Sequence, residues 1–200
     1  MTGRVIAVVG PSGVGKDSVM EGLHAALPNA HLVRRVITRA EDAGGEDFDP
    51  VSEAEFEALV DNGAFVLYWR AHGLSYGIPK MVKYQLGLGK DCLINFSRKM
   101  LRQADSVFPN LIVLNITAAP ETLAERLMSR NRETKEEIAK RLAQADKALP
   151  VGMDTRHLSN DGPLAETVAR GIALLCPDTN PGATDRPATP HTPTKSETVS

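Results

Sequence analysis

The fold of this chain is decided near its start, by the stretch VIAVVGPSGVGKDS at residues 5–18. The apolar run 5–9 predicts a buried strand, and apolar residues recur at helical spacing from Val19 to Leu27. Between them lies a G-x-x-x-x-G-K loop, whose glycines let backbone N–H groups point at phosphate oxygens while its lysine adds a mobile cation. The helix that follows directs its positive end at the same anion. The alternative is a glycine-rich turn that arose by chance. Such a turn has no reason to occur together with this strand, this lysine and this helix. We therefore expect the chain to bind a nucleoside triphosphate through Gly10, Pro11, Ser12, Gly13, Val14, Gly15, Lys16, Asp17 and Ser18.

The residue after the lysine departs from the motif. A serine or threonine hydroxyl is usual there as a magnesium ligand, whereas this chain has Asp17 followed by Ser18. A carboxylate is itself a good magnesium ligand, and its charge beside the phosphates is tolerable mainly when a cation lies between them. We expect Asp17 to contact Mg2+ directly or through water. The alternative, that Asp17 only stabilises the start of the helix, stays open.

Length and composition describe an ordinary globular domain. The chain has 200 residues, 42% of them hydrophobic and 24% charged, which is enough for one domain with a sizeable core. A net charge of -2 does not favour nucleic acid as a partner, and no apolar run approaches a membrane span. The first residues show no signal-peptide pattern, and Cys92 and Cys176 alone make no disulfide framework. We expect a cytoplasmic protein without a membrane partner, whose oligomeric state the sequence does not reveal.

Strand-like and helical patterns alternate along the rest of the chain. We expect strands at 31–37, 65–69, 92–96 and 111–116, and a short one ending at 157–158. A capping box at 52–55, Pro120 and the pattern at 163–175 predict helices. Residues 41–50 are interpreted as a loop and 73–77 as a turn, within a loop-rich middle section. The alternation predicts an α/β fold: a parallel sheet with helices on both faces and phosphates beyond the carboxyl ends of its strands.

Arginines crowd the segment 126–141. Phosphoryl transfer mainly requires that the protein position its reactants and neutralise charge with water kept out, and a mobile lid carrying arginines meets both needs. Arg130 and Arg141 are the first candidates, with Arg126 and Arg132 behind them. The alternative is a solvated helix face on which these arginines pair with neighbouring glutamates at helical spacing.

The order of these features resembles the guanylate-kinase-like family of P-loop kinases, over about residues 4–175. The shared motifs are a T-R pair, a G-x-D-aromatic motif, V-S at a helix start, a Y-G turn and the arginine-rich segment. In this chain they are Thr38-Arg39, Gly45 to Phe48, Val51-Ser52, Tyr76-Gly77 and Arg126 to Arg141. The resemblance implies that Arg39 and Tyr76 hold the phosphate of the acceptor. Phe48 stands where the family has a tyrosine, so that hydroxyl is missing.

Departures from the family bear on the acceptor. Guanylate kinases recognise guanine through a glutamate and an aspartate, whose positions correspond here to Leu67 and Ser97. A site built on such hydrogen bonds loses discrimination without them. Arg35 stands where the family has a serine, and Arg34, Arg70 and His72 are expected near it. The pocket has exchanged base-reading groups for anion-reading ones, so we expect an acceptor other than GMP.

One branch of this superfamily, the phosphonate-pathway kinases of ribose 1,5-bisphosphate, fits that exchange. The resemblance covers residues 15–18, 35–39, 44–47 and above all WRAHGLSYG at 69–77. It implies that ATP, with Mg2+, donates its γ-phosphoryl group to the 1-phosphate of a small phosphorylated sugar, which gives 5-phosphoribosyl 1-diphosphate. Lys16 and the lid arginines would stabilise the charge in flight. Arg35 and Arg39 would fix the acceptor, with Arg70 and Tyr76 beside them, and Asp47 would orient these arginines or a sugar hydroxyl.

In this interpretation residues 1–176 form one kinase domain. Its acceptor-binding region is expected at about 35–85 and its lid at about 126–145, while 177–200 is too poor in apolar residues to fold and is expected to be a disordered tail. Asn160-Asp161 would lie near adenine or cap the last helix. Two other functions stay open: a kinase for GMP or another nucleoside monophosphate, and a non-catalytic guanylate-kinase-like binding module. Leu67 and Ser97 argue against the first, and Lys16 with the lid argues against the second.

Overall fold

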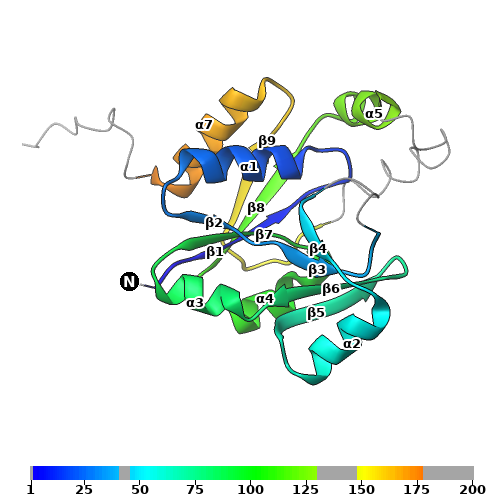
Figure 1. Ribbon diagram of the computed structural model, residues 1–200. Helices are drawn as coiled ribbons and strands as arrows, with labels where there is room; N and C mark the ends of the chain where they lie inside the picture. The colour runs from blue at the N-terminus through cyan, green and yellow to red at the C-terminus, as the bar shows by residue number, and fades with distance from the viewer. Residues whose placement is uncertain (1, 41–45, 130–147, 178–200) are drawn as a thin grey trace, which may run out of the picture.

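Strand β1 (Val5–Val9) runs through the centre of a five-stranded parallel sheet in the computed structural model, which describes residues 2–40, 46–129 and 148–177 (Figure 1). Alternate residues of β1 enter separate cores: Val5, Ala7 and Val9 on one face, Ile6 and Val8 on the other. Both faces are therefore covered, as a parallel sheet requires, and the predicted α/β fold is confirmed. The strand order is β2-β7-β1-β8-β9. The other four strands are β2 (Ala30–Leu32), β7 (Asp91–Asn95), β8 (Leu111–Thr117) and β9 (Thr155–Ser159).

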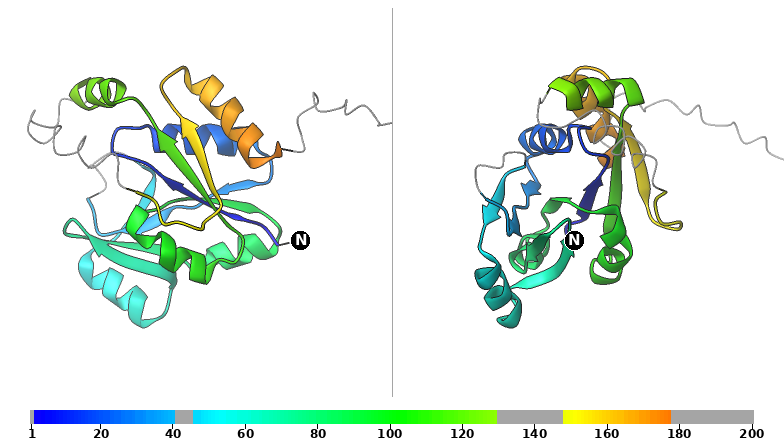
Figure 2. Two further views of the ribbon diagram at one scale, coloured as in Figure 1. Left: turned by 180° about the vertical axis from the view of Figure 1, so that it is seen from behind. Right: turned by 90° about the vertical axis from the view of Figure 1, so that its right-hand side faces the viewer.

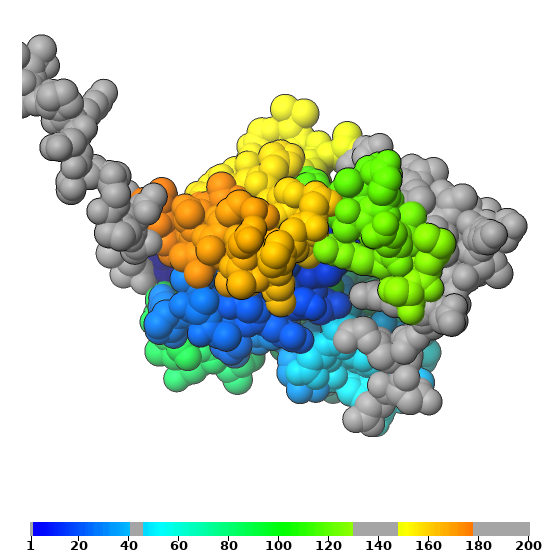
Figure 3. Space-filling model, turned by 90° about the horizontal axis from the view of Figure 1, so that it is seen from above, coloured from blue at the N-terminus to red at the C-terminus, as the bar shows by residue number. Residues whose placement is uncertain are grey.

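Helices lie on both sides of this sheet. On one side α1 (Lys16–Ala26) and α7 (Leu164–Leu175) lie alongside each other, with α5 (Pro120–Ser129) at one end (Figure 3). The two helices approach closely at Gly171, where a Cβ would lie 3.0 Å from the Leu23 side chain. The other side is covered by three elements that the sequence patterns did not predict: α3 (Met81–Gly87), the 3-10 turn η2 (Arg98–Met100) and α4 (Leu101–Val107).

A second, four-stranded sheet lies away from α1, α5 and α7 (Figure 2). Its strand order is β4-β3-β6-β5, and α2 packs on it with Phe56 stacked on Phe65 at 4.9 Å between ring centroids. The predicted capping box is present: the Ser52 hydroxyl accepts from the Glu55 N–H, and the Glu55 carboxylate accepts from the Ser52 N–H. The bounds are β3 (Arg35–Ile37), β4 (Phe48–Pro50), α2 (Glu53–Asp61), β5 (Phe65–Ala71) and β6 (Leu74–Pro79).

Three expectations about the middle of the chain were wrong. The stretch 31–37 is two strands in different sheets, because β2 pairs with β7 whereas β3 pairs with β6 and β4. Residues 48–50, expected within a loop, form β4. Of the expected turn at 73–77, residues 74–77 belong to β6. The turn that joins β5 to β6 is His72-Gly73, with φ of 54° and 72°, as the tight hairpin turn that matches strand twist requires. The middle section is therefore an ordered sheet rather than a loop-rich insert.

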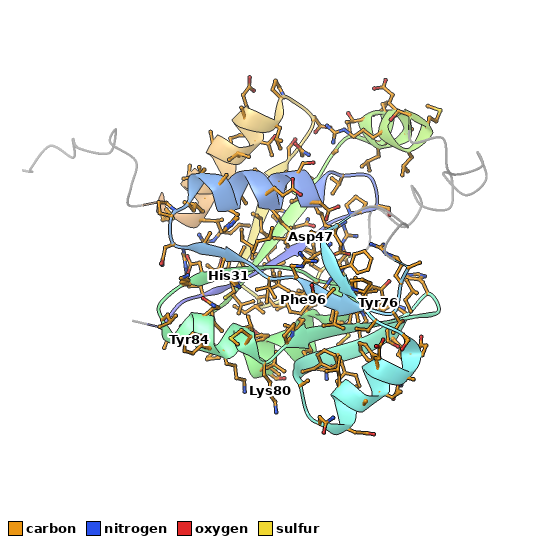
Figure 4. All side chains as sticks on the ribbon, in the orientation of Figure 1. His31, Asp47, Tyr76, Lys80, Tyr84 and Phe96 are labelled. Carbon is orange, nitrogen blue, oxygen red and sulfur yellow. The ribbon has the colours of Figure 1, made fainter. Side chains whose placement is uncertain are left out.

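The two sheets share a core, which holds them together. Leu67, Trp69 and Ile78 of the second sheet belong to the same buried cluster as β1 and β7. The Trp69 ring stacks on Phe96, directly after β7, with 6.2 Å between centroids. Phe96 and Tyr76 are labelled in Figure 4, where both lie in the region that joins the two sheets. This core places Arg35 of β3 close to the carboxyl end of β7, where Asn95 donates to the same Glu46 carboxylate as Arg35.

Several predicted features lie outside the described residues: part of the acidic loop, the candidates Arg130, Arg132 and Arg141, and the tail from 178 on. Within the described part of the chain, no helix combines the length and hydropathy that crossing a membrane would need.

Candidate active site

The glycine loop has the backbone that phosphate binding needs. Gly13 and Gly15 have φ of 82° and 84°, which L side chains rarely adopt, and α1 begins at Lys16 directly behind them. The Lys16 ammonium folds back over the loop and donates to the carbonyl oxygens of Gly10 at 3.2 Å and Pro11 at 3.1 Å. The loop, the helix N-terminus and the lysine therefore converge on one anion-binding concavity.

Charges from four other residues act on Lys16. Burial lowers the pKa of this ammonium below its ordinary value, and the neighbouring carboxylates Asp17 and Glu46 oppose that shift. Arg35 and Arg98 lower the pKa further by repulsion. The phosphate loop, β3, the segment before β4 and η2 thus bring their charges to a common region.

Asn160 supports the phosphate loop from below, a role that the sequence pattern did not reveal. Its side chain is buried, and its Nδ2 donates to the Val14 carbonyl at 2.8 Å. A Cβ on Gly15 would lie 2.8 Å from this same nitrogen, so the loop glycine also permits the contact. Asp161 accepts from the Ala119 N–H at 2.6 Å, immediately before α5, while the N-cap of α7 is Pro163. Neither Asn160 nor Asp161 therefore caps the last helix, as one of the two expectations had it. The only sequence feature that could have indicated the role of Asn160 at the loop is its position directly after a strand.

Arg35 lies at the centre of the acceptor side. Its side chain is 7% exposed, and its guanidinium carbon lies 5.0 Å from the Tyr76 ring centroid and 5.6 Å from that of Trp69. The two rings are themselves stacked, 5.3 Å apart and inclined by 8°. Glu46 neutralises the guanidinium by accepting from both Nε and Nη2. The sequence favoured Asp47 for this role, one residue along the chain.

Arg39 presents cationic donors that have no partner among the described residues. Its guanidinium carbon lies 4.3 Å from the centroid of the Phe48 ring, so the aromatic that replaces the family's tyrosine supplies a face rather than a hydroxyl. Its Nε and Nη2 are both buried, and neither donates a hydrogen bond to any of the described residues. Leaving such donors unpaired is costly, and an anion would satisfy both. The cavity beside Arg39, about 360 Å3, is lined by Thr38, Arg39, Ala40, Pro50, Val51, Ser52, Glu53 and Glu55.

Two of the expected acceptor residues point elsewhere. Asp47 pairs with Arg34 at 3.0 Å on the surface, where both side chains are about half exposed (Figure 4). Arg70 forms an exposed pair with Glu57 of α2. Because side chains alternate along β5, Arg70 lies on the face opposite Trp69 and the stacked Arg35. The structure thus gathers Lys16 and Arg35 with Arg39 and Tyr76 on neighbouring elements, and does not bring Asp47 or Arg70 to Arg35.

A second polar cavity of about 450 Å3 opens between β8 and β9. Asn115 contacts His157 there at 3.1 Å through Nδ2, while its Oδ1 is buried with no partner in the described chain. Arg98, whose charge acts on Lys16, contributes to the wall. The cavity is lined by Arg98, Asn115, Thr117, Thr155, His157 and residues 148–153.

This arrangement suits a reaction between two phosphorylated molecules. The glycine loop and Lys16 form a site suited to a polyphosphate. Arg39, two residues after β3 of the second sheet, has two buried donors that an anionic acceptor could satisfy. Within the described residues, no group of three or more histidine, cysteine, aspartate or glutamate side chains could hold a metal by itself. A magnesium ion here would take few protein ligands, which fits its habit of binding one or two carboxylates, substrate phosphates and water.

Comparisons with known proteins agree with this geometry. The guanylate kinase family model matches residues 2–156. The chain is 51% identical over 174 residues to ribose 1,5-bisphosphate phosphokinase PhnN of Ruegeria sp., covering 86% of this chain and 92% of the relative. The protein of the same name from Rhizobium etli is 43% identical over 176 residues, covering 86% and 89%.

Among solved structures, guanylate kinase from Anaplasma phagocytophilum superposes with a TM-score of 0.63 at 20% identity, covering 90% of this chain and 88% of that one. A gluconokinase from Sinorhizobium meliloti gives a TM-score of 0.52 at 18% identity, covering 88% and 93%. At these identities the likeness concerns the fold. With its family model matched over most of its length and curated relatives matched almost end to end, the chain is a kinase that belongs to the guanylate kinase family and, within it, to the ribose 1,5-bisphosphate phosphokinases.

Proposed function

We propose that this kinase transfers the γ-phosphoryl group of ATP to the 1-phosphate of ribose 1,5-bisphosphate, which yields 5-phosphoribosyl 1-diphosphate and ADP. One observation carries the proposal: beside an intact phosphate loop, Arg39 offers two buried donors to an anion, while neither Leu67 nor Ser97 supplies a base-reading carboxylate. Leu67, at one base-reading position, is buried in the apolar core, and Ser97 at the other carries no charge. A sugar with two phosphates needs cations and no base pocket.

The donor side positions the triphosphate. Backbone N–H groups of the loop and the N-terminus of α1 would bind the terminal phosphates, and Lys16 would follow the charge between them. Asn160 holds the loop in the conformation that this binding needs. Because these groups are ordered before the nucleotide arrives, they stabilise developing charge at little reorganisation cost.

The acceptor side supplies charge rather than base catalysis. The two unpartnered donors of Arg39 would bind the reacting phosphate of the sugar, and Tyr76 would border the same space. An oxygen of the 1-phosphate is already anionic and attacks without losing a proton, so no strong general base is required. Arg130 and Arg141 are proposed to complete the neutralisation from the lid, and both lie outside the described residues.

Asp17 is proposed to hold Mg2+, directly or through water, and the ion when bound neutralises charge on the β- and γ-phosphates. Asp17 lies in the first turn of α1 and acts electrostatically on Lys16, so its carboxylate is close to the phosphate site. We expect Asp17→Asn to raise the Mg2+ concentration needed for half-maximal rate by about 10-fold, since it removes one charged ligand. If Asp17→Asn needed the same Mg2+ concentration as the parent enzyme, the metal role would be wrong and Asp17 would only stabilise the start of the helix.

The proposal includes a cytoplasmic location, supported by the use of ATP and by a sequence whose two cysteines are too few for a disulfide framework. There the product would serve reactions that consume 5-phosphoribosyl 1-diphosphate.

The decisive experiment offers ribose 1,5-bisphosphate and GMP separately, each with magnesium-ATP, and follows ADP release and the phosphorylated product. We expect turnover with the sugar and none above background with GMP, and Lys16→Met as the matched control should abolish transfer in both. Turnover with GMP would show that Leu67 and Ser97 are not at the base-reading positions. Inactivity with both acceptors, in a protein whose melting temperature ATP raises, would reject the sugar as substrate.

A further inference from the structure

Glu46 is a carboxylate held rigidly between the two sheets. Arg35 donates to it through Nε at 3.1 Å and through Nη2, and Asn95, at the carboxyl end of β7, donates to Oε2 at 3.3 Å. The Arg35 guanidinium cannot swing away easily, because the rings of Trp69 and Tyr76 lie against it. Two packed elements therefore determine where this carboxylate points.

One hydrogen-bonding position on Glu46 remains open. A carboxylate offers about four acceptor positions. Among the described contacts, Oε2 accepts from Arg35 and Asn95, whereas Oε1 accepts from Arg35 alone. The Glu46 side chain is 16% exposed against 7% for Arg35, so it is the more accessible member of the pair. Its charge acts on the Lys16 ammonium, which agrees with a position in the region of the phosphate loop.

The open acceptor position on Oε1 suits a neutral hydrogen-bond donor. A phosphate approaching Oε1 would be repelled, while a sugar hydroxyl can donate to it. The other carboxylates of this segment do not compete, because Asp47 and Asp49 both pair with Arg34 on the surface. In ribose 1,5-bisphosphate, the hydroxyl beside the reacting 1-phosphate is the 2-hydroxyl.

We propose that Glu46 is a specificity-determining residue, whose Oε1 accepts a hydrogen bond from the 2-hydroxyl of the acceptor sugar. The inference rests on the proposed function and names the group that reads the sugar at that site. Arg35 is then a positioning residue, since it holds Glu46 in place and compensates its charge. The enzyme selects a ribosyl over a 2-deoxyribosyl acceptor because the deoxy sugar leaves this half-buried carboxylate without its fourth hydrogen bond.

The test compares kcat/KM for ribose 1,5-bisphosphate and 2-deoxyribose 1,5-bisphosphate at saturating magnesium-ATP. The ratio of the two is internal to each variant, so partial misfolding lowers both values and leaves the ratio unchanged. We expect a ratio of about 30 or more in the parent enzyme, the range for a hydrogen bond to a charged group. Glu46→Ala should bring the ratio close to 1 through a higher KM for the ribosyl substrate, with KM for ATP unchanged. Glu46→Gln keeps the size of the side chain and loses its charge, so its ratio should lie between those of the parent and Glu46→Ala.

Asp47→Asn is the matched control, because it removes a neighbouring carboxylate that faces Arg34, and its ratio should equal that of the parent. A parent ratio near 1, or a ratio that survives in Glu46→Ala and Glu46→Gln, would overturn the inference while leaving the proposed function intact. A parent enzyme inactive with ribose 1,5-bisphosphate would overturn the proposed function and this inference with it.

Discussion

Replacing Arg39 by methionine should stabilise the ligand-free enzyme and at the same time disable it. Two donors of Arg39 are buried without a partner among the described residues, and each such group costs about 1–3 kcal/mol. Methionine removes both donors and retains much of the apolar stem. It also removes the contact with the Phe48 ring at 4.3 Å, worth about 0.5–2 kcal/mol. At the middle of these ranges the balance favours the variant by about 3 kcal/mol. Each kcal/mol raises the melting temperature by about 2–4 °C in a chain of this size.

The same two donors account for the expected loss of acceptor binding. Each would make a charge-assisted bond to phosphate worth about 1.5–3 kcal/mol. Their removal costs about 3 kcal/mol at the least, or a KM for the acceptor raised roughly 100-fold or more, with KM for ATP little changed.

Calorimetric unfolding without ligand and initial-rate kinetics measure the two effects on the same preparation. Arg34→Met is the control, because Arg34 makes exposed ion pairs with Asp47 and Asp49 and surface pairs contribute about 0–1 kcal/mol. A methionine variant that melts below the parent and keeps the parent's acceptor KM would refute the reasoning, since Arg39 would then be a satisfied structural residue.

Three further predictions concern stability and the phosphate loop. Asn160→Ala removes the bond to the Val14 carbonyl and should cost about 1–3 kcal/mol and weaken ATP binding about 10-fold in titration calorimetry; unchanged ATP affinity would limit Asn160 to a structural role. Bonds from the Ala119 N–H and from a serine hydroxyl lower the pKa of Asp161 below its ordinary 3.8, so this carboxylate stabilises the fold above that pH. In urea unfolding, the stability gap between the parent and Asp161→Asn should close as pH falls below 3.8, and a gap independent of pH would contradict this. Burial raises the pKa of Cys92 from 9.0 to about 11, so the neutral thiol contributes stability that is complete below pH 9 and lost as pH passes 11. Cys92→Ala should lack this part of the loss of stability at alkaline pH. Curves of unfolding free energy against pH that run parallel for the parent and Cys92→Ala would contradict this prediction.

Much of the fold could be predicted because its signals are local. The apolar run of β1, the glycines before Lys16 and the capping box at Ser52 each act within a few residues, and the structure confirms them. The strands expected at 65–69, 92–96 and 111–116 are also present. Where a segment's partner lies far along the chain, the prediction failed: nothing near residues 31–37 indicates that its two halves pair in different sheets.

The candidate site, like the fold, combines features that the local sequence predicted with features that it did not. The motif placed Lys16 at the phosphate loop, and the resemblance singled out Arg35, Arg39 and Tyr76. Arg35 and Tyr76 lie in the four-stranded sheet, and Arg39 follows its strand β3 by two residues. Which carboxylate pairs with Arg35 was not predictable, because neighbouring residues of an extended chain point in opposite directions and a shift of one position exchanges them. Glu46 therefore turns inward while Asp47 turns to the surface.

By itself, then, the sequence determined the type of fold and the phosphate loop, because residue type and short spacing are sufficient for each. Tertiary structure alone decided that Asn160 supports the loop, that Arg70 faces away from Arg35, and that Glu46 is fixed by Arg35 and Asn95. These contacts join elements distant in the chain, and their geometry follows from how two sheets pack on a shared core.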